Sequence, residues 1–241
     1  MATNPLSDPV AAFEVLAVAG LAVAANRKRL LNASGAFAAF LVGTTIIVTT
    51  NIFWLILLMS LLVLAGVATR AQYKKKAARG TEEARGGVRR TRNVLANGLA
   101  PTLIALFHGP IDSLLEPGAS SLLFIGAVAA AAADTFASEF GGLSKKVVLI
   151  TSFQRVPPGT DGGISWTGQV AAFAGAMIIS ALGIVLLGSL PFTASIEPTP
   201  AAFTAGNLVA STVAGFLGCQ ADSFLGATLE VRGRLTKEEV N

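Results

Sequence analysis

The chain has 241 residues, of which 53% are hydrophobic and only 13% are charged. Because ordinary soluble domains carry about 25% charged residues, this composition excludes a conventional soluble globular protein. The formal net charge is +4, but the basic residues gather in short loops between long apolar runs, a pattern that predicts a multi-pass protein of the cell membrane and no nucleic-acid partner.

Seven apolar segments follow one another along the chain and are predicted to be helices. A membrane-spanning helix needs about 20 apolar residues, yet residues 30–69 contain no charged residue. This stretch is therefore expected to cross twice, with a turn at the polar, β-branched tripeptide 49–51. The fourth segment is interrupted by Gly98 and Pro101, so we expect an all-α transmembrane bundle of six to seven spans, forming one integral membrane domain over residues 1–241. The predicted helices cover residues 10–25, 34–48, 52–68, 94–107, 120–137, 170–190 and 202–218.

Lysine and arginine in short loops mark the cytoplasmic side of a membrane protein. Basic clusters follow the first, third, fifth and seventh predicted helices, and the largest is the segment 70–92, with nine Lys and Arg against two Glu. The connections 109–118 and 191–200 contain neither Lys nor Arg. The pattern predicts that the N-terminus is outside, that the C-terminus is cytoplasmic, and that residues 70–92 form a basic cytoplasmic loop.

A short acidic motif occurs twice. Ala-Asp-Thr-Phe at residues 133–136 recurs 88 residues later as Ala-Asp-Ser-Phe. An acid near the end of an apolar helix is costly unless it is solvated or paired, so Asp134 and Asp222 are functional candidates. Both helices are predicted to run towards the cytoplasm, where two carboxylates, with Glu139 as a further ligand, would hold Mg²⁺ beside phosphate oxygens. The alternative is that each aspartate ends a helix beside the lipid headgroups.

The segment 140–168 is predicted to be a Gly/Pro-rich cytoplasmic loop. Glycine amides and hydroxyl groups can surround an anion, and basic side chains supply its countercharge. The alternative for such a cluster is a tight turn. No Walker phosphate-binding motif is present. The expected phosphate contacts of this loop are Lys145, Lys146, Arg155, Gly159, Thr160, Gly162, Gly163 and Ser165.

The end of the basic loop and the start of the fourth helix hold further candidates. Arg90, Arg92, Asn93 and Asn97 enter this helix on the predicted cytoplasmic side and are expected to contact phosphate or nucleotide. The lysines earlier in the loop more often contact lipid headgroups. The only histidine, His108, falls on the opposite side, which argues against Ser-His-Asp catalysis.

Four motifs together resemble those of a known family. They are Asn-Val-Leu-Ala-Asn-Gly at 93–98, Ala-Asp-Thr-Phe-Ala-Ser-Glu-Phe-Gly at 133–141, Val-Pro-Pro-Gly-Thr-Asp-Gly-Gly-Ile-Ser at 156–165 and Ala-Asp-Ser-Phe-Leu-Gly-Ala-Thr-Leu-Glu at 221–230. The family consists of integral membrane proteins long catalogued as a domain of unknown function, and it includes animal transmembrane protein nineteen and plant phytyl-phosphate kinase. The resemblance runs over nearly the whole chain. It implies a shared fold and, from the plant member, phosphorylation of phytyl phosphate to the diphosphate with a nucleoside triphosphate donor.

The residues and the resemblance lead to one expected function. It is a membrane-embedded kinase that transfers a phosphoryl group from CTP or ATP to a phytyl- or geranylgeranyl-type monophosphate. Asp134 and Asp222 would hold Mg²⁺, and Lys145 and Lys146 would neutralise developing charge. A CTP-dependent nucleotidyltransferase acting on a lipid phosphate and a transporter of small ions or lipids remain alternatives. The lipid bilayer is the expected partner, and a homo-oligomer stays open.

Overall fold

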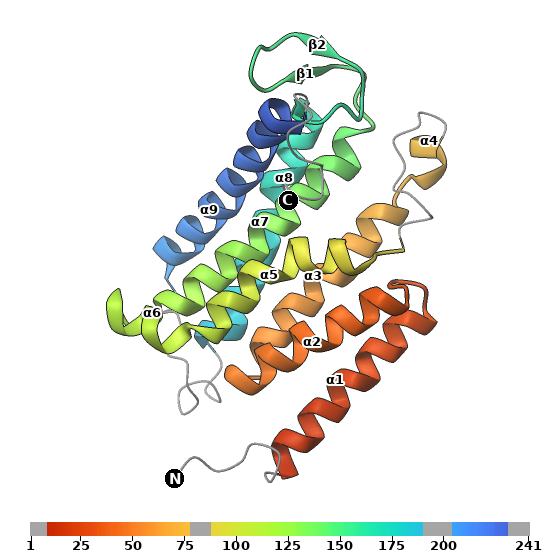
Figure 1. Ribbon diagram of the computed structural model, residues 1–241. Helices are drawn as coiled ribbons and strands as arrows, with labels where there is room; N and C mark the ends of the chain where they lie inside the picture. The colour runs from red at the N-terminus through yellow and green to blue at the C-terminus, as the bar shows by residue number, and fades with distance from the viewer. Residues whose placement is uncertain (1–8, 78–87, 190–203, 231–241) are drawn as a thin grey trace.

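The computed structural model describes residues 9–77, 88–189 and 204–230, which form a helical bundle with a small sheet at one end (Figure 1). The all-α membrane bundle expected from the sequence is confirmed, and the predicted helices are found with shifted ends. The largest shift is at the last helix, which continues past residue 218 and so contains Asp222. The described elements are α1 (Pro9–Arg27), α2 (Ala33–Thr49), α3 (Ile52–Arg70), α4 (Tyr73–Ala77), α5 (Thr91–Leu106), α6 (His108–Leu114), α7 (Ala119–Gly141), β1 (Val147–Leu149), β2 (Arg155–Val156), β3 (Gly163–Ile164), α8 (Trp166–Ile184), the π-helical turn η3 (Val185–Ser189), α9 (Ala205–Leu225) and the π-helical turn η5 (Gly226–Glu230).

The turn between α2 and α3 lies where the sequence predicted it. The Thr50 hydroxyl donates to the Ile46 carbonyl at 2.6 Å, which closes the end of α2. Asn51 caps the start of α3, because its side-chain oxygen accepts the amide hydrogen of Phe53 at 3.0 Å. Such side chains satisfy backbone groups that a helix end leaves without an intrahelical partner. The chain therefore reverses within two residues.

Five helices in the described ranges are long and apolar enough to cross a membrane, namely α1, α3, α7, α8 and α9. The helices α5 and α6 meet at 65° and form a sixth candidate, as a broken span or a re-entrant loop. The apolar helix α2 has 17 residues, the lower limit of about 17–25 residues for a membrane span. The count of seven spans and the outside location of the N-terminus stay predictions.

Helix α7 is the centre of the bundle and packs against α3, α5, α8 and α9. Small residues allow its close approach to α8 and α9. A Cβ added to Gly175 of α8 would lie 3.0 Å from the Ala132 carbonyl oxygen, and one added to Gly215 of α9 would lie 2.6 Å from the Ala129 Cβ. Contacts between small residues bring helices together in lipid, where no hydrophobic force drives them to associate.

The contacts also give the relative directions of the helices. Near the starts of α3 and α7, the rings of Trp54 and Phe124 lie 4.3 Å apart. Near their ends, the Thr69 hydroxyl donates to the Glu139 carboxylate, so these two helices run parallel. Helix α8 runs antiparallel to α7, because Gly168 at its start lies against the end of α7.

Helices α2 and α5 also run parallel to each other. A Cβ on Gly35 would lie 2.7 Å from the Arg89 carbonyl oxygen, and one on Gly98 would lie 3.4 Å from a Val42 methyl group. Because α2 reverses tightly into α3, the starts of α2, α5 and α8 lie at the same end as the ends of α3 and α7. We call this end, marked by the strand labels in Figure 1, the sheet end.

The segment predicted as a Gly/Pro-rich loop contains a small antiparallel sheet of order β2-β1-β3. Val147 pairs with Val156, and Val148 pairs with Ile164. Strands of two or three residues carry too little alternation to be found by hydropathy, which is why the sequence prediction missed them. The sheet therefore ties the parts of the loop to one another.

Candidate functional site

Helices α7 and α9 pack so that residues 88 positions apart in the sequence, the spacing of the repeated acidic motif, lie beside each other. A Cβ added to Gly126 would lie 3.7 Å from the Ala214 Cβ, and one added to Gly218 would lie 2.7 Å from the Ala130 Cβ. In both contacts the two residues are 88 positions apart, so the helices are parallel. Residues four apart lie on the same helix face, and one turn further the same spacing pairs Asp134 with Asp222.

A buried cysteine lies near both aspartates. The Cys219 side chain is 1% exposed, and its thiol is near enough to Asp134 and to Asp222 to interact electrostatically with both. Both aspartates are half-buried, and Oδ1 of Asp222 is fully buried. The helix register therefore places the two aspartates at the same level of the α7–α9 packing, near the sheet end of the bundle.

Glu139 lies beyond this pair along α7. It is buried, and its Oε1 accepts the Thr69 hydroxyl hydrogen of α3. Among the described residues, no group of three or more His, Cys, Asp or Glu side chains is placed to hold a metal ion, so Glu139 does not join the two aspartates in one cluster. Mg²⁺ in proteins commonly has one or two carboxylate ligands and completes its shell with phosphate oxygens and water. Asp134 and Asp222 supply two carboxylates, and binding of Mg²⁺ by them or by Glu139 stays a prediction.

The Gly/Pro-rich loop is anchored beside the same helix end. Gly162 has φ of 70°, a left-handed conformation that favours glycine, and a Cβ there would collide with Ala227 of η5. Ala227 lies five residues after Asp222 along the chain. The basic side chains of Lys145, Lys146 and Arg155 are exposed. The loop therefore carries its positive charges at the sheet end, where the aspartates also lie.

Several groups that the sequence assigned to phosphate hold the loop together. The Thr160 hydroxyl donates to the Pro157 carbonyl at 2.8 Å, and the Gly163 amide donates to the Thr160 carbonyl at 2.9 Å. Ser165 is the N-cap of α8, and its Oγ accepts the Gly168 amide hydrogen at 3.1 Å. These bonds correspond to the tight-turn alternative. Contacts of these residues and of Gly159 and Gly162 with phosphate stay predictions.

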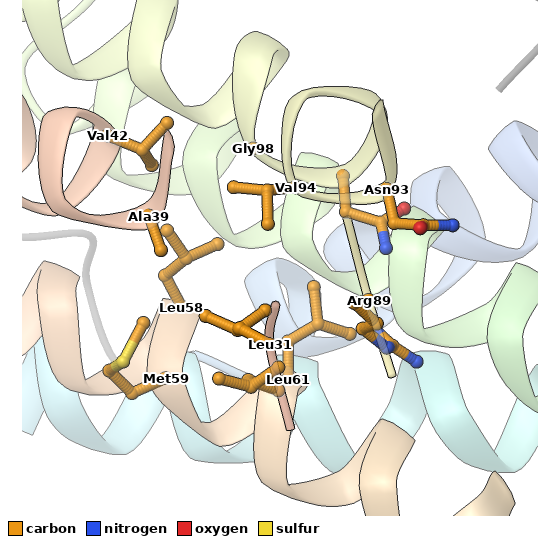
Figure 2. A pocket seen from close by; sticks show the side chains of 12 residues that line it. Leu31, Ala39, Val42, Leu58, Met59, Leu61, Arg89, Asn93, Val94 and Gly98 are labelled. Atoms are coloured by element: carbon orange, nitrogen blue, oxygen red, sulfur yellow. The ribbon is translucent and has the colours of Figure 1, made fainter. Parts of the chain in front are cut away.

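The start of α5 contributes a second group of polar residues. Arg90 and Arg92 are exposed. The Asn93 side-chain oxygen accepts the Arg90 amide hydrogen at 3.0 Å, which caps the helix. Asn93 and Asn97 also line a pocket of about 50 Å³ between α2, α3 and α5, and Arg89 lies beside them. Figure 2 shows Arg89 and Asn93 on one side of this pocket, with apolar side chains filling the other.

The sequence prediction missed this pocket. It named Asn93 and Asn97 but treated Arg89 as part of the basic loop. The pocket wall joins segments that lie far apart in the sequence, and hydropathy along the chain carries no signal for that contact. The lining residues are Leu31, Ala39, Val42, Leu58, Met59, Leu61, Leu62, Arg89, Asn93, Val94, Asn97 and Gly98.

Residues 16–241 match the family described as "Integral membrane protein DUF92". An uncharacterized membrane protein of Methanocaldococcus jannaschii is 32% identical over 228 residues, which cover 94% of this chain and 86% of the relative. Protein PGR of Arabidopsis thaliana is 32% identical over 232 residues, covering 92% of this chain and 79% of the relative. Chloroplastic protein VTE6 of the same plant is 29% identical over 163 residues, covering 65% and 47%. No solved structure matches the chain. With a match over nearly its whole length, the chain belongs to the DUF92 family of integral membrane proteins.

Proposed function

We propose that this protein is a membrane-embedded kinase that transfers a phosphoryl group from CTP or ATP to a prenyl monophosphate of the phytyl or geranylgeranyl type. The observation that carries the proposal is the in-register packing of α7 and α9, which supports a pairing of Asp134 with Asp222. Acids in spanning helices are functional candidates, and two carboxylates at the same level of one helix pair are suitable ligands for a divalent cation. The motif resemblance to plant phytyl-phosphate kinase supports the choice of reaction.

Phosphoryl transfer depends on positioning and on the stabilisation of charge. Asp134 and Asp222 would hold Mg²⁺, which would supply positive charge to offset that of the donor phosphates. Lys145, Lys146 and Arg155 stand exposed at the same end and would offset the charge that develops on the leaving nucleotide. An oxygen of the acceptor phosphate attacks the γ-phosphorus, the bond between the β- and γ-phosphates breaks, and the nucleoside diphosphate leaves. The acceptor is already ionised, so the chain needs no strong general base.

The first experiment measures transfer of γ-labelled phosphate from CTP or ATP to geranylgeranyl or phytyl monophosphate, with purified protein in detergent and Mg²⁺. We expect a labelled lipid diphosphate, with turnover lost on chelation of Mg²⁺. Asp134→Asn and Asp222→Asn should each lower turnover roughly 10²-fold or more, because each removes a ligand of the Mg²⁺ that would offset transition-state charge. Glu116→Gln is the control, since Glu116 is an exposed acid between α6 and α7, away from the sheet end. It should leave turnover unchanged.

The same assay with α-labelled nucleotide separates the two enzymatic alternatives. A product that carries the α-labelled nucleotide would replace the kinase with a nucleotidyltransferase acting through the same acids. Absence of transfer from both nucleotides to several prenyl phosphates would overturn the proposal. An asparagine variant that kept turnover within a few-fold of wild type would remove the carboxylate pair from the mechanism.

A further inference from the structure

The pocket between α2, α3 and α5 has a mixed lining. Its wall is largely apolar, with Leu58 and Leu61 from α3 and Val42 from α2, but Arg89, Asn93 and Asn97 contribute polar groups. Figure 2 shows Arg89 and Asn93 on the side away from Met59 and Val42. A concave apolar site with a few convergent polar groups is the usual form of a small-molecule site. Its amphipathic lining matches a ligand that has an apolar chain and a polar head.

The polar side of the pocket suits a phosphate. The Arg89 backbone is held in place, because its amide donates to the Leu30 carbonyl at 3.0 Å and its carbonyl accepts the Asn32 amide hydrogen at 3.0 Å. A guanidinium is always charged and presents planar pairs of donors that match phosphate oxygens. The Asn93 side-chain oxygen is used in the helix cap, which leaves its NH₂ group as a donor.

The part of the pocket nearest the sheet end and the two aspartates lie at similar depths in the bundle. Helices α3 and α7 are parallel and are joined by the hydrogen bond from Thr69 to Glu139. Leu62 of the pocket lies seven residues before Thr69, and Asp134 lies five residues before Glu139. At 1.5 Å per residue, Leu62 lies about 10 Å and Asp134 about 8 Å along the helix axis from the contact between Thr69 and Glu139. Helix α5, which carries Asn93 and Asn97, packs against α7.

We infer that this pocket binds the prenyl monophosphate acceptor, an inference that rests on the proposed function. The phosphate contacts Arg89, Asn93 and Asn97, and the first part of the prenyl chain lies among the apolar side chains. A volume of about 50 Å³ holds several water-sized groups, since one needs roughly 10–15 Å³. The pocket therefore takes the head and the first carbons, and the rest of the chain extends into the bilayer.

Photolabelling tests the site without turnover. The probe is geranylgeranyl monophosphate with a diazirine on its first isoprene unit, added to the full-length protein without nucleotide. We expect labelled peptides from α3 and α5, and competition by unlabelled geranylgeranyl monophosphate but not by equal amounts of geranylgeraniol or phosphatidic acid. Labelling spread over α1 and α9, or equal competition by phosphatidic acid, would overturn the inference.

Two pairs of variants sharpen the test. Ala39→Phe fills the pocket and should lower labelling at least tenfold, whereas Ala100→Phe adds the same ring at an exposed position of α5 and should not. Arg89→Gln should weaken competition by the monophosphate about 10- to 100-fold, the usual effect of losing a hydrogen bond to a charged group, while Arg27→Gln, at the exposed end of α1, should not. If the thermal midpoint shows that Ala39→Phe is misfolded, Ala39→Leu replaces it with the same expectation.

The two proposals fail separately. Labelling confined to the pocket in a protein that transfers no phosphate would overturn the kinase proposal. The pocket would then remain a binding site for prenyl phosphate. Phosphate transfer with labelling elsewhere would overturn the pocket as the acceptor site and leave the kinase proposal standing. Asp134→Asn should abolish transfer and leave labelling of the pocket unchanged, because Asp134 does not line it.

Discussion

Gly218→Ala tests the close packing of α7 and α9 that pairs the two aspartates. The new methyl group would lie 2.7 Å from the Ala130 Cβ, and its next neighbour is the Ala130 Cα at 3.8 Å. Overpacking of this kind costs about 1–3 kcal/mol, whereas alanine in place of glycine within a helix recovers about 1 kcal/mol. We therefore expect a net destabilisation of about 0–2 kcal/mol.

A second substitution isolates the contact. Because one methyl group causes the clash, Ala130→Gly in the Gly218→Ala background should remove it, with a coupling energy of about 1–3 kcal/mol between the two sites. Gly215→Ala is the matched comparison. Its methyl group would meet the carbonyl carbon of Ala129 at 3.0 Å and the amide nitrogen of Ala130 at 3.2 Å. No side-chain deletion relieves a clash with the backbone, so Ala129→Gly should rescue Gly215→Ala only in part.

The assay is the thermal midpoint in detergent, followed in parallel with phosphate transfer. For a chain of this size each kcal/mol shifts the midpoint by about 2–4 °C. Gly218 is one helical turn from Asp222, and a displacement of about 1 Å at a reacting group can lower turnover 10²-fold. The single variant should therefore lose more activity than stability, and the double variant should regain both. An unchanged midpoint and unchanged turnover for Gly218→Ala, with no coupling to Ala130→Gly, would refute the in-register packing.

Three further predictions concern the rest of the sheet end and the topology. Thr69→Val removes the hydroxyl that donates to the buried carboxylate of α7 and should destabilise the protein by about 1–3 kcal/mol, whereas Thr69→Ser should restore the midpoint. Gly162→Ala introduces a Cβ at a left-handed φ against η5 and should lower the midpoint and phosphate transfer together. Gly20→Ala, within α1 and with open space around it, should not lower the midpoint, since alanine is the better helix former, and should leave phosphate transfer unchanged. Lys145→Cys should react with a membrane-impermeant thiol reagent only from the cytoplasmic side and Leu114→Cys only from outside, and the opposite result would reverse the predicted orientation.

The sequence by itself determined the kind of protein and the positions of its helices. Hydropathy is summed along the chain, so the uncharged stretch of residues 30–69 was enough to place two helices and the turn at Thr50 and Asn51. The repeat around Asp134 and Asp222 identified the acids, and their motifs led to the family. Each of these features is local in the chain and needs no knowledge of which helices are neighbours.

The tertiary structure decided which faces meet. Helices α7 and α9 are adjacent in the 88-residue register because glycines admit the neighbouring helix. The small sheet and the turn bonds of Thr160 and Gly163 depend on contacts within the loop. The pocket at Arg89 exists only where α2, α3 and α5 meet. Packing is set by the shapes of surfaces that come from distant parts of the chain, and hydropathy and motif spacing contain no information about those shapes.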